Sequence, residues 1–228
     1  MSIFENEKFI VANFKQSGNI NSMKEWLVEF KKQLNELGEL KINIVLCPSF
    51  QFLDLFNREL GLENKNPKIF IGSQNLSSFS NLENTGEVGA ENLKDLVKFS
   101  LLGHSERKEN FDDVTRKYQN AITNTIVPIV CFYENKEVYS LDNCLFAYED
   151  PNAISKDGVY KDKDFNDMVG VIQSLKELFE DKPVLYGGSV RPENAQMIKD
   201  LNFFKGVLVG RASLDAKSLA EIIKVFNK

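Results

Sequence analysis

Three side chains that can move or stabilise charge stand where apolar runs of the sequence end. Lys15 follows "FIVANF", Glu149 ends "LFAYE", and His104, the only histidine of the chain, follows "FSLLG". A carboxylate can abstract a proton, an imidazole can polarise a carbonyl group, and an ammonium group can stabilise the negative charge that results. Together these residue types indicate proton transfer next to a carbonyl group.

Glycine-containing turns end two further apolar runs. "VLYGGS" places two glycines before Ser189, and "VLVGRAS" places Gly210 before Arg211. Such turns can present backbone N–H groups to an anion, and in many barrels the last two strand ends bind phosphate in this way. A phosphorylated carbonyl compound fits both the chargeable side chains and these turns.

Eight apolar runs rich in β-branched residues must position these side chains, and segments with helical spacing separate most of the runs. The runs lack clean alternation, as expected for parallel strands that are covered on both faces. The expected strands are 8–15, 43–49, 69–76, 99–105, 125–132, 145–149, 183–190 and 206–213. The expected helices are 23–37, 50–60, 90–99, 112–124, 165–180, 192–201 and 215–227.

This series of strand-then-helix units, without linker or repeat, predicts an α/β fold, a closed (β/α)8 TIM barrel that forms a single domain over residues 1–228. Only ten residues separate Glu134 from Leu145, which is too few for a full helix with its loops. We therefore expect the fifth helix to be reduced to a turn or an irregular segment. In such a barrel, the side chains that end the strands converge on one rim.

Composition narrows the classes of partner. The formal net charge of −5, with acids and lysines interspersed, argues against a nucleic acid or an anionic membrane surface. No stretch is apolar enough to span a bilayer and the first residues do not resemble a signal peptide, so we expect a cytoplasmic protein. The three cysteines lack metal-ligand spacing, so we expect reduced, mostly buried thiols and no metal site.

Several short motifs resemble, in the same order, the signatures of the triosephosphate isomerase family. They are "NFK" (13–15), "TGE" (85–87), "GHSER" (103–107), "PIVC" (128–131), "AYE" (147–149), "YGGSV" (186–190) and "VGRASL" (209–214). The resemblance runs from about residue 8 to the C-terminus. It implies an enzyme of glycolysis and gluconeogenesis that interconverts dihydroxyacetone phosphate and D-glyceraldehyde 3-phosphate without a metal or organic cofactor.

The resemblance also implies a role for each residue at the rim, and these roles are the family's own. Glu149 would shuttle the proton between adjacent carbons. His104 would hydrogen-bond the enediolate as a neutral imidazole at the start of a short helix, whose N-terminus disfavours the imidazolium. Lys15 and Asn13 would bind the substrate and stabilise its oxyanion. The phosphate would contact Ser155, Ser189, Gly210 and Arg211.

Two loops acquire expected functions from the same resemblance. Residues 150–158, "DPNAISKDG", would form a mobile lid that keeps the enediolate phosphate from eliminating phosphate. Residues 77–89 would form an interdigitating loop of a homodimer, with Thr85 near the active site of the partner. The 77–89 segment is also long for a simple strand-to-helix connection.

The chain departs from the family pattern at several positions. Asp150 begins the lid where the family usually has proline, Ser155 replaces a lid glycine, and Arg211 replaces a second glycine. If the position of Arg211 required a positive φ, the side chain would strain the backbone there. Phe132 and Tyr133 also stand where the family has smaller residues. We therefore expect a shortened, divergent member.

Simpler interpretations apply to single residues. A lone histidine after a strand is more often structural than catalytic, and only its neighbours reverse that expectation. Ser105 is expected to cap a helix, and Glu106 fits capping and function equally well. Two other functions stay open: another phosphate-binding barrel enzyme, such as an aldolase or an isomerase of amino-acid biosynthesis, and a catalytically silent scaffold. Intact Asn13, Lys15, His104 and Glu149 argue against the scaffold.

Overall fold

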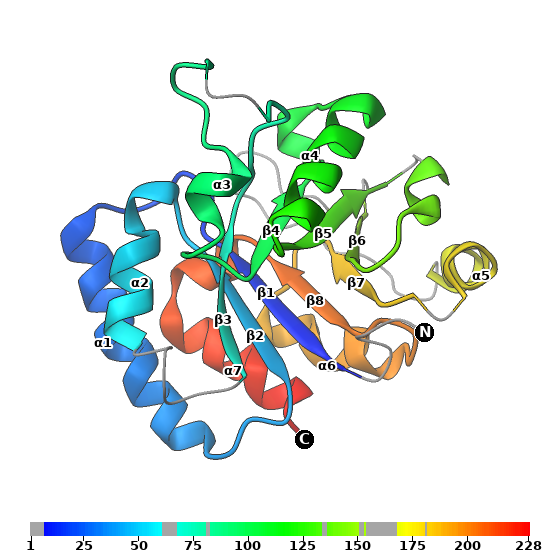
Figure 1. Cartoon of the computed structure of the whole chain (residues 1–228). Coiled ribbons are helices and arrows are strands. Elements are labelled where there is room, and N and C mark those ends of the chain that lie inside the picture. Colours follow the sequence, from blue (N-terminus) through cyan, green and yellow to red (C-terminus); the bar gives the residue numbers. More distant parts are fainter. Residues whose placement is uncertain are drawn as a thin grey trace.

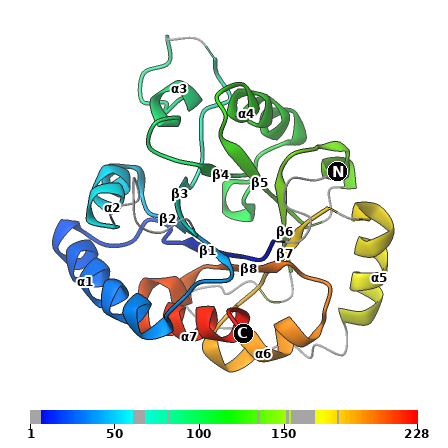
Figure 2. The ribbon, with the colours of Figure 1, turned by 60° about the horizontal axis from the view of Figure 1, so that its bottom comes forward.

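Eight parallel strands form a closed barrel. The computed structural model describes residues 7–60, 68–80, 83–133, 136–150, 153, 168–180 and 182–228. The strands follow one another in chain order, β8 pairs with β1, and helices lie around the outside (Figures 1 and 2). They are β1 (Phe9–Asn13), β2 (Asn43–Cys47), β3 (Ile69–Ser73), β4 (Phe99–Leu102), β5 (Val127–Phe132), β6 (Leu145–Glu149), β7 (Val184–Gly187) and β8 (Gly206–Val209). The predicted barrel is confirmed, and each strand lies within its predicted range.

Both faces of the strands are buried, which explains their continuous apolar runs. In β1, Phe9 and Val11 belong to a core cluster inside the barrel, whereas Ile10 and Ala12 belong to the larger cluster beneath the helices. Alternate residues of a strand point to opposite faces, so one strand supplies both cores. Two cores built from the same strands hold the strand ends in fixed positions.

The helices that cover the barrel carry recognisable start signals. The Asn19 side chain accepts hydrogen bonds from the backbone N–H groups of Asn21 and Ser22 at the start of the first helix, and Pro192 is the first residue of α6. The α-helices are α1 (Ile20–Leu37), α2 (Leu53–Leu60), α3 (Ala90–Leu93), α4 (Phe111–Thr123), α5 (Met168–Phe179), α6 (Pro192–Asp200) and α7 (Ala216–Phe226). The 3₁₀ helices among the described residues are η1 (Phe50–Phe52), η2 (Ser105–Arg107), η3 (Lys136–Ser140) and η5 (Arg211–Leu214).

The prediction of a helix over 90–99 is wrong beyond its first turn. The α3 helix ends at Leu93, and the backbone N–H of Val97 folds back onto the Leu93 carbonyl. The N–H of the next residue, Lys98, already donates to the carbonyl of Ile71 at 2.8 Å. The backbone therefore enters the sheet before a second helical turn can form.

The prediction of a reduced fifth helix is confirmed. Between β5 and β6 lies η3, a 3₁₀ helix of five residues, in place of a full α-helix. Val138 of η3 and Leu141 just after it are buried against the barrel, while Tyr139 is exposed. These two apolar side chains cover the part of the barrel that a longer helix would otherwise cover.

The three cysteines are buried and form no disulfide, as predicted. Burial raises the pKa of the Cys144 thiol to about 12 and raises the pKa values of Cys47 and Cys131 as well. Thiols with raised pKa values are protonated near neutral pH and are poor nucleophiles. Within the described ranges, no helix is long and apolar enough to cross a membrane.

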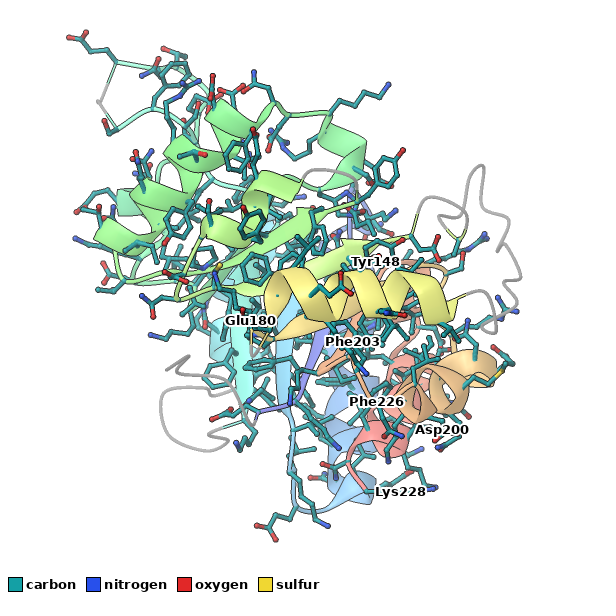
Figure 3. All side chains as sticks on the ribbon, turned by 90° about the vertical axis from the view of Figure 1, so that its right-hand side faces the viewer. Tyr148, Glu180, Asp200, Phe203, Phe226 and Lys228 are labelled. Carbon is teal, nitrogen blue, oxygen red and sulfur yellow. The ribbon has the colours of Figure 1, made fainter. Side chains whose placement is uncertain are left out.

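The parallel arrangement brings all carboxyl ends of the strands to one rim. Figure 3 shows Tyr148, the residue before Glu149, above α5, and Phe226 and Lys228 of the C-terminal region below it. Side chains that end the strands meet at the rim to which Glu149 belongs, as barrel geometry requires.

Candidate active site

A cavity at this rim collects the predicted site residues that the structure describes. They come from the ends of β1, β4, β6, β7 and β8, which are far apart in the sequence. Its lining residues are Asn13, Lys15, His104, Glu149, Gly187, Gly188, Ser189, Val190, Leu208, Gly210 and Arg211. Ser155 lies outside the described residues, as does most of the expected lid at 150–158.

The carboxylate of Glu149 is buried and held by the turn after β4. Its side chain is only 6% exposed, one oxygen accepts the backbone N–H of Ser105, and the other accepts the Ser105 hydroxyl, both at 2.7 Å. His104 Nε2 lies 3.3 Å from Glu149 Oε1. The candidate base, Glu149, and the candidate electrophile, His104, are thus in direct contact. Ser105, which binds the same carboxylate, lies 44 positions before Glu149 in the chain.

The expectation that Ser105 caps a helix is wrong. Ser105 is the first residue of η2, and the capping position belongs to His104, whose side chain accepts the backbone N–H of Glu106. The Ser105 hydroxyl is therefore available for Glu149. The motif "GHSER" did not reveal this bond, because its partner lies on another strand.

The capping bond fixes the orientation of the imidazole. Nδ1 of His104 accepts the N–H of Glu106 at 3.3 Å, and the side chain is 12% exposed. Because Nδ1 acts as an acceptor, a neutral ring carries its proton on Nε2, the nitrogen close to Glu149. The site therefore presents an N–H group and a carboxylate oxygen side by side at the cavity.

Lys15 occupies a strained backbone conformation that several hydrogen bonds hold. Its φ of 52° lies in the left-handed region, where a residue other than glycine costs about 1–2 kcal/mol. Its N–H donates to Asn13 Oδ1 at 3.0 Å, and its carbonyl accepts from Ser49 and Gln74, each at 2.9 Å. Sequence reasoning did not identify Ser49 and Gln74, although both stand just after strands, at the same rim.

The ammonium group of Lys15 forms an ion pair with Glu106. Both side chains are partly exposed, 34% for Lys15 and 51% for Glu106. Such an exposed pair contributes little to stability because water screens it. The pair joins the residue after β1 to η2, the 3₁₀ helix that carries Glu106.

The turn after β7 depends on glycine. A Cβ atom on Gly188 would lie 2.8 Å from the Tyr186 hydroxyl oxygen and 3.0 Å from Cβ of Ala153. The next residue, Ser189, has a φ of 42°. The backbone therefore passes close to its neighbours here, and residues 187–190 line the cavity.

The turn after β8 accepts an arginine without strain. Arg211 is the first residue of η5 and does not have a positive φ, so the backbone there does not require glycine. A Cβ atom on the preceding Gly210 would lie 3.3 Å from Cε of Lys15, which favours a small residue at that position. Arginine at position 211 departs from the family pattern but still provides a backbone N–H.

Asp150 begins the expected lid as a buried residue. Its side chain is fully buried, its N–H donates to the carbonyl of Gly187 at 2.9 Å, and its carboxylate accepts the Tyr186 hydroxyl at 3.3 Å. Burial raises the pKa of Tyr186, and the negative charge of Asp150 adds to that increase. These contacts join the end of β6 to β7 directly behind Glu149.

Comparison with known proteins identifies the family. The chain matches the model of the triosephosphate isomerase family over residues 8–226. It is 30% identical to the triosephosphate isomerase of Gloeobacter violaceus, over 95% of this chain and 97% of that protein. The triosephosphate isomerase of Wolbachia pipientis wMel is 32% identical, over 96% of this chain and 94% of its own length. The predicted relationship is confirmed: the chain belongs to the triosephosphate isomerase family and is an isomerase.

Proposed function

We propose that this chain interconverts dihydroxyacetone phosphate and D-glyceraldehyde 3-phosphate by proton transfer through an enediolate. The observation that carries the proposal is the contact between Glu149 and His104 in a cavity that glycine turns also line. The membership in the family supports the same reaction. In the cell, the reaction belongs to glycolysis and gluconeogenesis.

In the proposed mechanism, Glu149 removes a proton from the carbon next to the carbonyl group. The electron pair of the broken C–H bond forms the enediolate, whose negative charge resides on oxygen. The hydroxyl proton moves from one of the two adjacent oxygens to the other, and the same carboxylic acid then gives its proton, or one exchanged with solvent, to the adjacent carbon, so no proton is gained or lost overall. The side chain of Glu149 is 6% exposed.

His104 and Lys15 stabilise the charge that this step creates. The Nε2–H group of a neutral His104 can donate to either of the two adjacent oxygens, and the ammonium group of Lys15 offsets the negative charge. Asn13, 5% exposed at the end of β1, holds the Lys15 backbone and also lines the cavity. The reaction needs no metal or organic cofactor.

The phosphate group of the substrate would contact the turns after β7 and β8. Ser189, Gly210 and Arg211 line the same cavity as Glu149, and η5 begins at Arg211. Backbone N–H groups in such turns bind phosphate oxygens well. In this proposal Ser155 adds a further backbone N–H, and residues 150–158 cover the bound substrate.

We also propose a cytoplasmic homodimer formed through residues 77–89. Thr85 is exposed, and Phe79 is 52% exposed, an unusual position for a large aromatic side chain. A second copy would bury Phe79 and bring Thr85 close to the partner's site. Sedimentation at micromolar concentration checks the assembly, and a purely monomeric chain would contradict it.

A coupled assay tests the proposed reaction. The purified chain is given glyceraldehyde 3-phosphate, and formation of dihydroxyacetone phosphate is followed. We expect kcat/KM to approach the diffusional ceiling of about 10⁸ M⁻¹s⁻¹. A matched control is Glu59→Gln, which removes an exposed carboxylate that pairs with Lys31, far from the cavity, and should leave the rate unchanged. No rate above that of heat-denatured protein would refute the proposed function.

A further inference from the structure

A buried ion pair lies beside the turn that carries His104. The side chains of Glu109 and Lys117 are 8% and 6% exposed, and Lys117 Nζ lies 2.6 Å from Glu109 Oε1. Lys117 also donates to Asn75 Oδ1 at 2.7 Å, and Arg107 Nε donates to Glu109. Burying charges is unfavourable unless they are paired and hydrogen-bonded, and this cluster satisfies both conditions.

The Glu109 carboxylate holds the backbone on both sides of His104. Its Oε2 atom accepts the N–H of Gly103, the residue before His104, at 3.3 Å. Its Oε1 atom accepts from the side chain of Arg107, three residues after His104. Lys117 connects the same oxygen to α4 and, through Asn75, to the segment after β3. One carboxylate therefore joins the two ends of the turn to two neighbouring elements.

On this side the turn lies close to Val114 and Cys131 at Gly103 and also borders open space. Gly103 and Ser105 border a cavity of about 280 Å³, which Glu109, Cys131 and Glu149 also line. Gly103 has a φ of 70°, which suits glycine. The adjoining cavity leaves room for the turn to shift if its hydrogen bonds are lost. The Glu109 contacts are positioned to prevent that shift.

Glu109 remains charged in this setting. Burial raises the pKa of its carboxyl group, but the hydrogen bonds and positive charges of Lys117 and Arg107 outweigh burial and leave the pKa below its usual value. An ionised carboxylate is a stronger acceptor than a neutral acid. The bond to the Gly103 N–H is therefore present throughout the neutral range of pH.

We propose that Glu109, anchored by Lys117, is a positioning residue that holds the Gly103–Arg107 turn so that His104 faces the cavity and Ser105 holds Glu149. It touches neither the substrate nor the reacting atoms and acts through the two residues that do. This inference deepens the proposed function and rests on it for its kinetic consequences. The effect on the orientation of His104 does not depend on which reaction the site performs.

The kinetic prediction separates turnover from substrate binding. Glu109→Ala frees the turn, and a displacement of about 1 Å can lower a rate by about 10²-fold. We expect kcat to fall by about 10- to 100-fold, while KM and the Kd for inorganic phosphate change little. The phosphate-binding turns after β7 and β8 do not contact Glu109 in the hydrogen bonds and ion pairs described, which is why binding should be spared.

The single histidine of the chain offers a direct structural readout. His104 is the only histidine in the sequence, so protein labelled with ¹⁵N-histidine and made without a histidine tag gives one imidazole spin system. In the unaltered chain we expect the pattern of a neutral ring with the proton on Nε2 and Nδ1 accepting. In Glu109→Ala we expect a mixture of the two tautomers, because the bond from Glu106 N–H is no longer held in place.

Two further variants complete the test. Glu91→Ala removes one partner of an exposed ion pair with Lys94 and should change neither kcat nor the imidazole signals. Lys117→Met keeps the bond between Glu109 and the Gly103 N–H but removes the lysine that anchors Glu109. Its effects on kcat and on the imidazole signals should therefore have the same direction as those of Glu109→Ala and be smaller. It also serves if Glu109→Ala fails to fold.

The outcomes distinguish this inference from the proposed function. If the unaltered chain has no isomerase activity but Glu109→Ala or Lys117→Met alters the imidazole signals, the proposed function fails and the positioning role stands. If folded Glu109→Ala keeps both its imidazole signals and its kcat, the positioning role is refuted. If only Lys117→Met folds, unchanged imidazole signals and an unchanged kcat in that variant also refute the positioning role.

Discussion

Two neighbouring parts of the active-site lining, its first and second side, are built in different ways. On one side, Glu149, His104 and Ser105 hold one another through side-chain contacts of 2.7 to 3.3 Å. On the other, the turns after β7 and β8 line the cavity, with glycines at 187, 188 and 210. The first side depends on the chemical identity of each side chain. The second depends on backbone conformation, which is why arginine at 211 is compatible with it.

The largest effect should come from the first side, at Glu149. Glu149→Gln keeps the shape of the side chain but removes the base, so kcat should fall by roughly 10²–10⁴. The free energy of unfolding should change far less than the activation barrier. The coupled assay together with thermal unfolding of the same preparation measures both quantities, and a folded variant with most of its turnover would remove Glu149 from the mechanism.

The next effect should come from His104. His104→Ala removes the Nε2–H donor and should lower kcat by about 10²–10³, the range typical of losing one preorganised donor. The variant also loses the side-chain cap of η2. Addition of imidazole to the assay provides a control, since partial rescue would assign the loss to the missing donor. Near-normal activity in the unrescued variant would contradict the role of His104.

A smaller effect, of a different kind, should follow from Gly188→Ala on the second side. The added Cβ would lie 2.8 Å from the Tyr186 hydroxyl oxygen, so the turn must move. Overpacking of this kind destabilises a local conformation by about 1–3 kcal/mol. We therefore expect KM and the Kd for inorganic phosphate to rise about 5- to 100-fold, with kcat less affected.

Gly170→Ala is the matched control for that change. Gly170 lies in α5, and a Cβ atom there would meet nothing within 4 Å. Replacing a helical glycine by alanine should raise the free energy of unfolding by about 0.5–1 kcal/mol and leave the kinetics unchanged. If Gly188→Ala behaved like Gly170→Ala, the second side would not depend on close backbone approach.

The smallest effect should come from Arg211→Gly. The backbone of Arg211 does not have a positive φ, and the N–H is present with either residue. Glycine adds flexibility to the unfolded chain, so we expect a loss of stability of at least about 0.4–1 kcal/mol and nearly unchanged KM. Chemical denaturation and the coupled assay measure the two effects. A large fall in KM would instead show that the arginine side chain obstructs the phosphate site.

The barrel could be predicted from the sequence because its strands are buried on both faces. A run such as 43–49 or 125–132 is then continuously apolar, and its ends mark the rim without any three-dimensional information. The helix expected over 90–99 was wrong because apolar spacing continued after Leu93, while the backbone had already turned toward β4. The periodicity of apolar residues carries no information about the backbone hydrogen bonds that determine where such a helix ends.

The pairing of residues across the rim could not be predicted in the same way. The Ser105 hydroxyl binds Glu149, and Glu109 binds the Gly103 N–H, through contacts that depend on turn geometry rather than on residue type. The backbone conformation of Arg211 could not be predicted from the sequence either, since arginine is compatible with several φ values. Sequence motifs identified which residues lie at the rim, and the structure identified which of them hold the others.

One measurement tests the proton-transfer role of Glu149 most directly. Glyceraldehyde 3-phosphate is converted in D₂O by the unaltered chain and by Glu149→Gln, and ¹H NMR follows both the product and its deuterium content. We expect the unaltered chain to form dihydroxyacetone phosphate that carries solvent deuterium on the carbon that received the proton. Glu149→Gln should neither convert nor exchange above roughly 1% of that rate. Conversion and exchange at a similar rate in both proteins would contradict the assignment of Glu149 as the base.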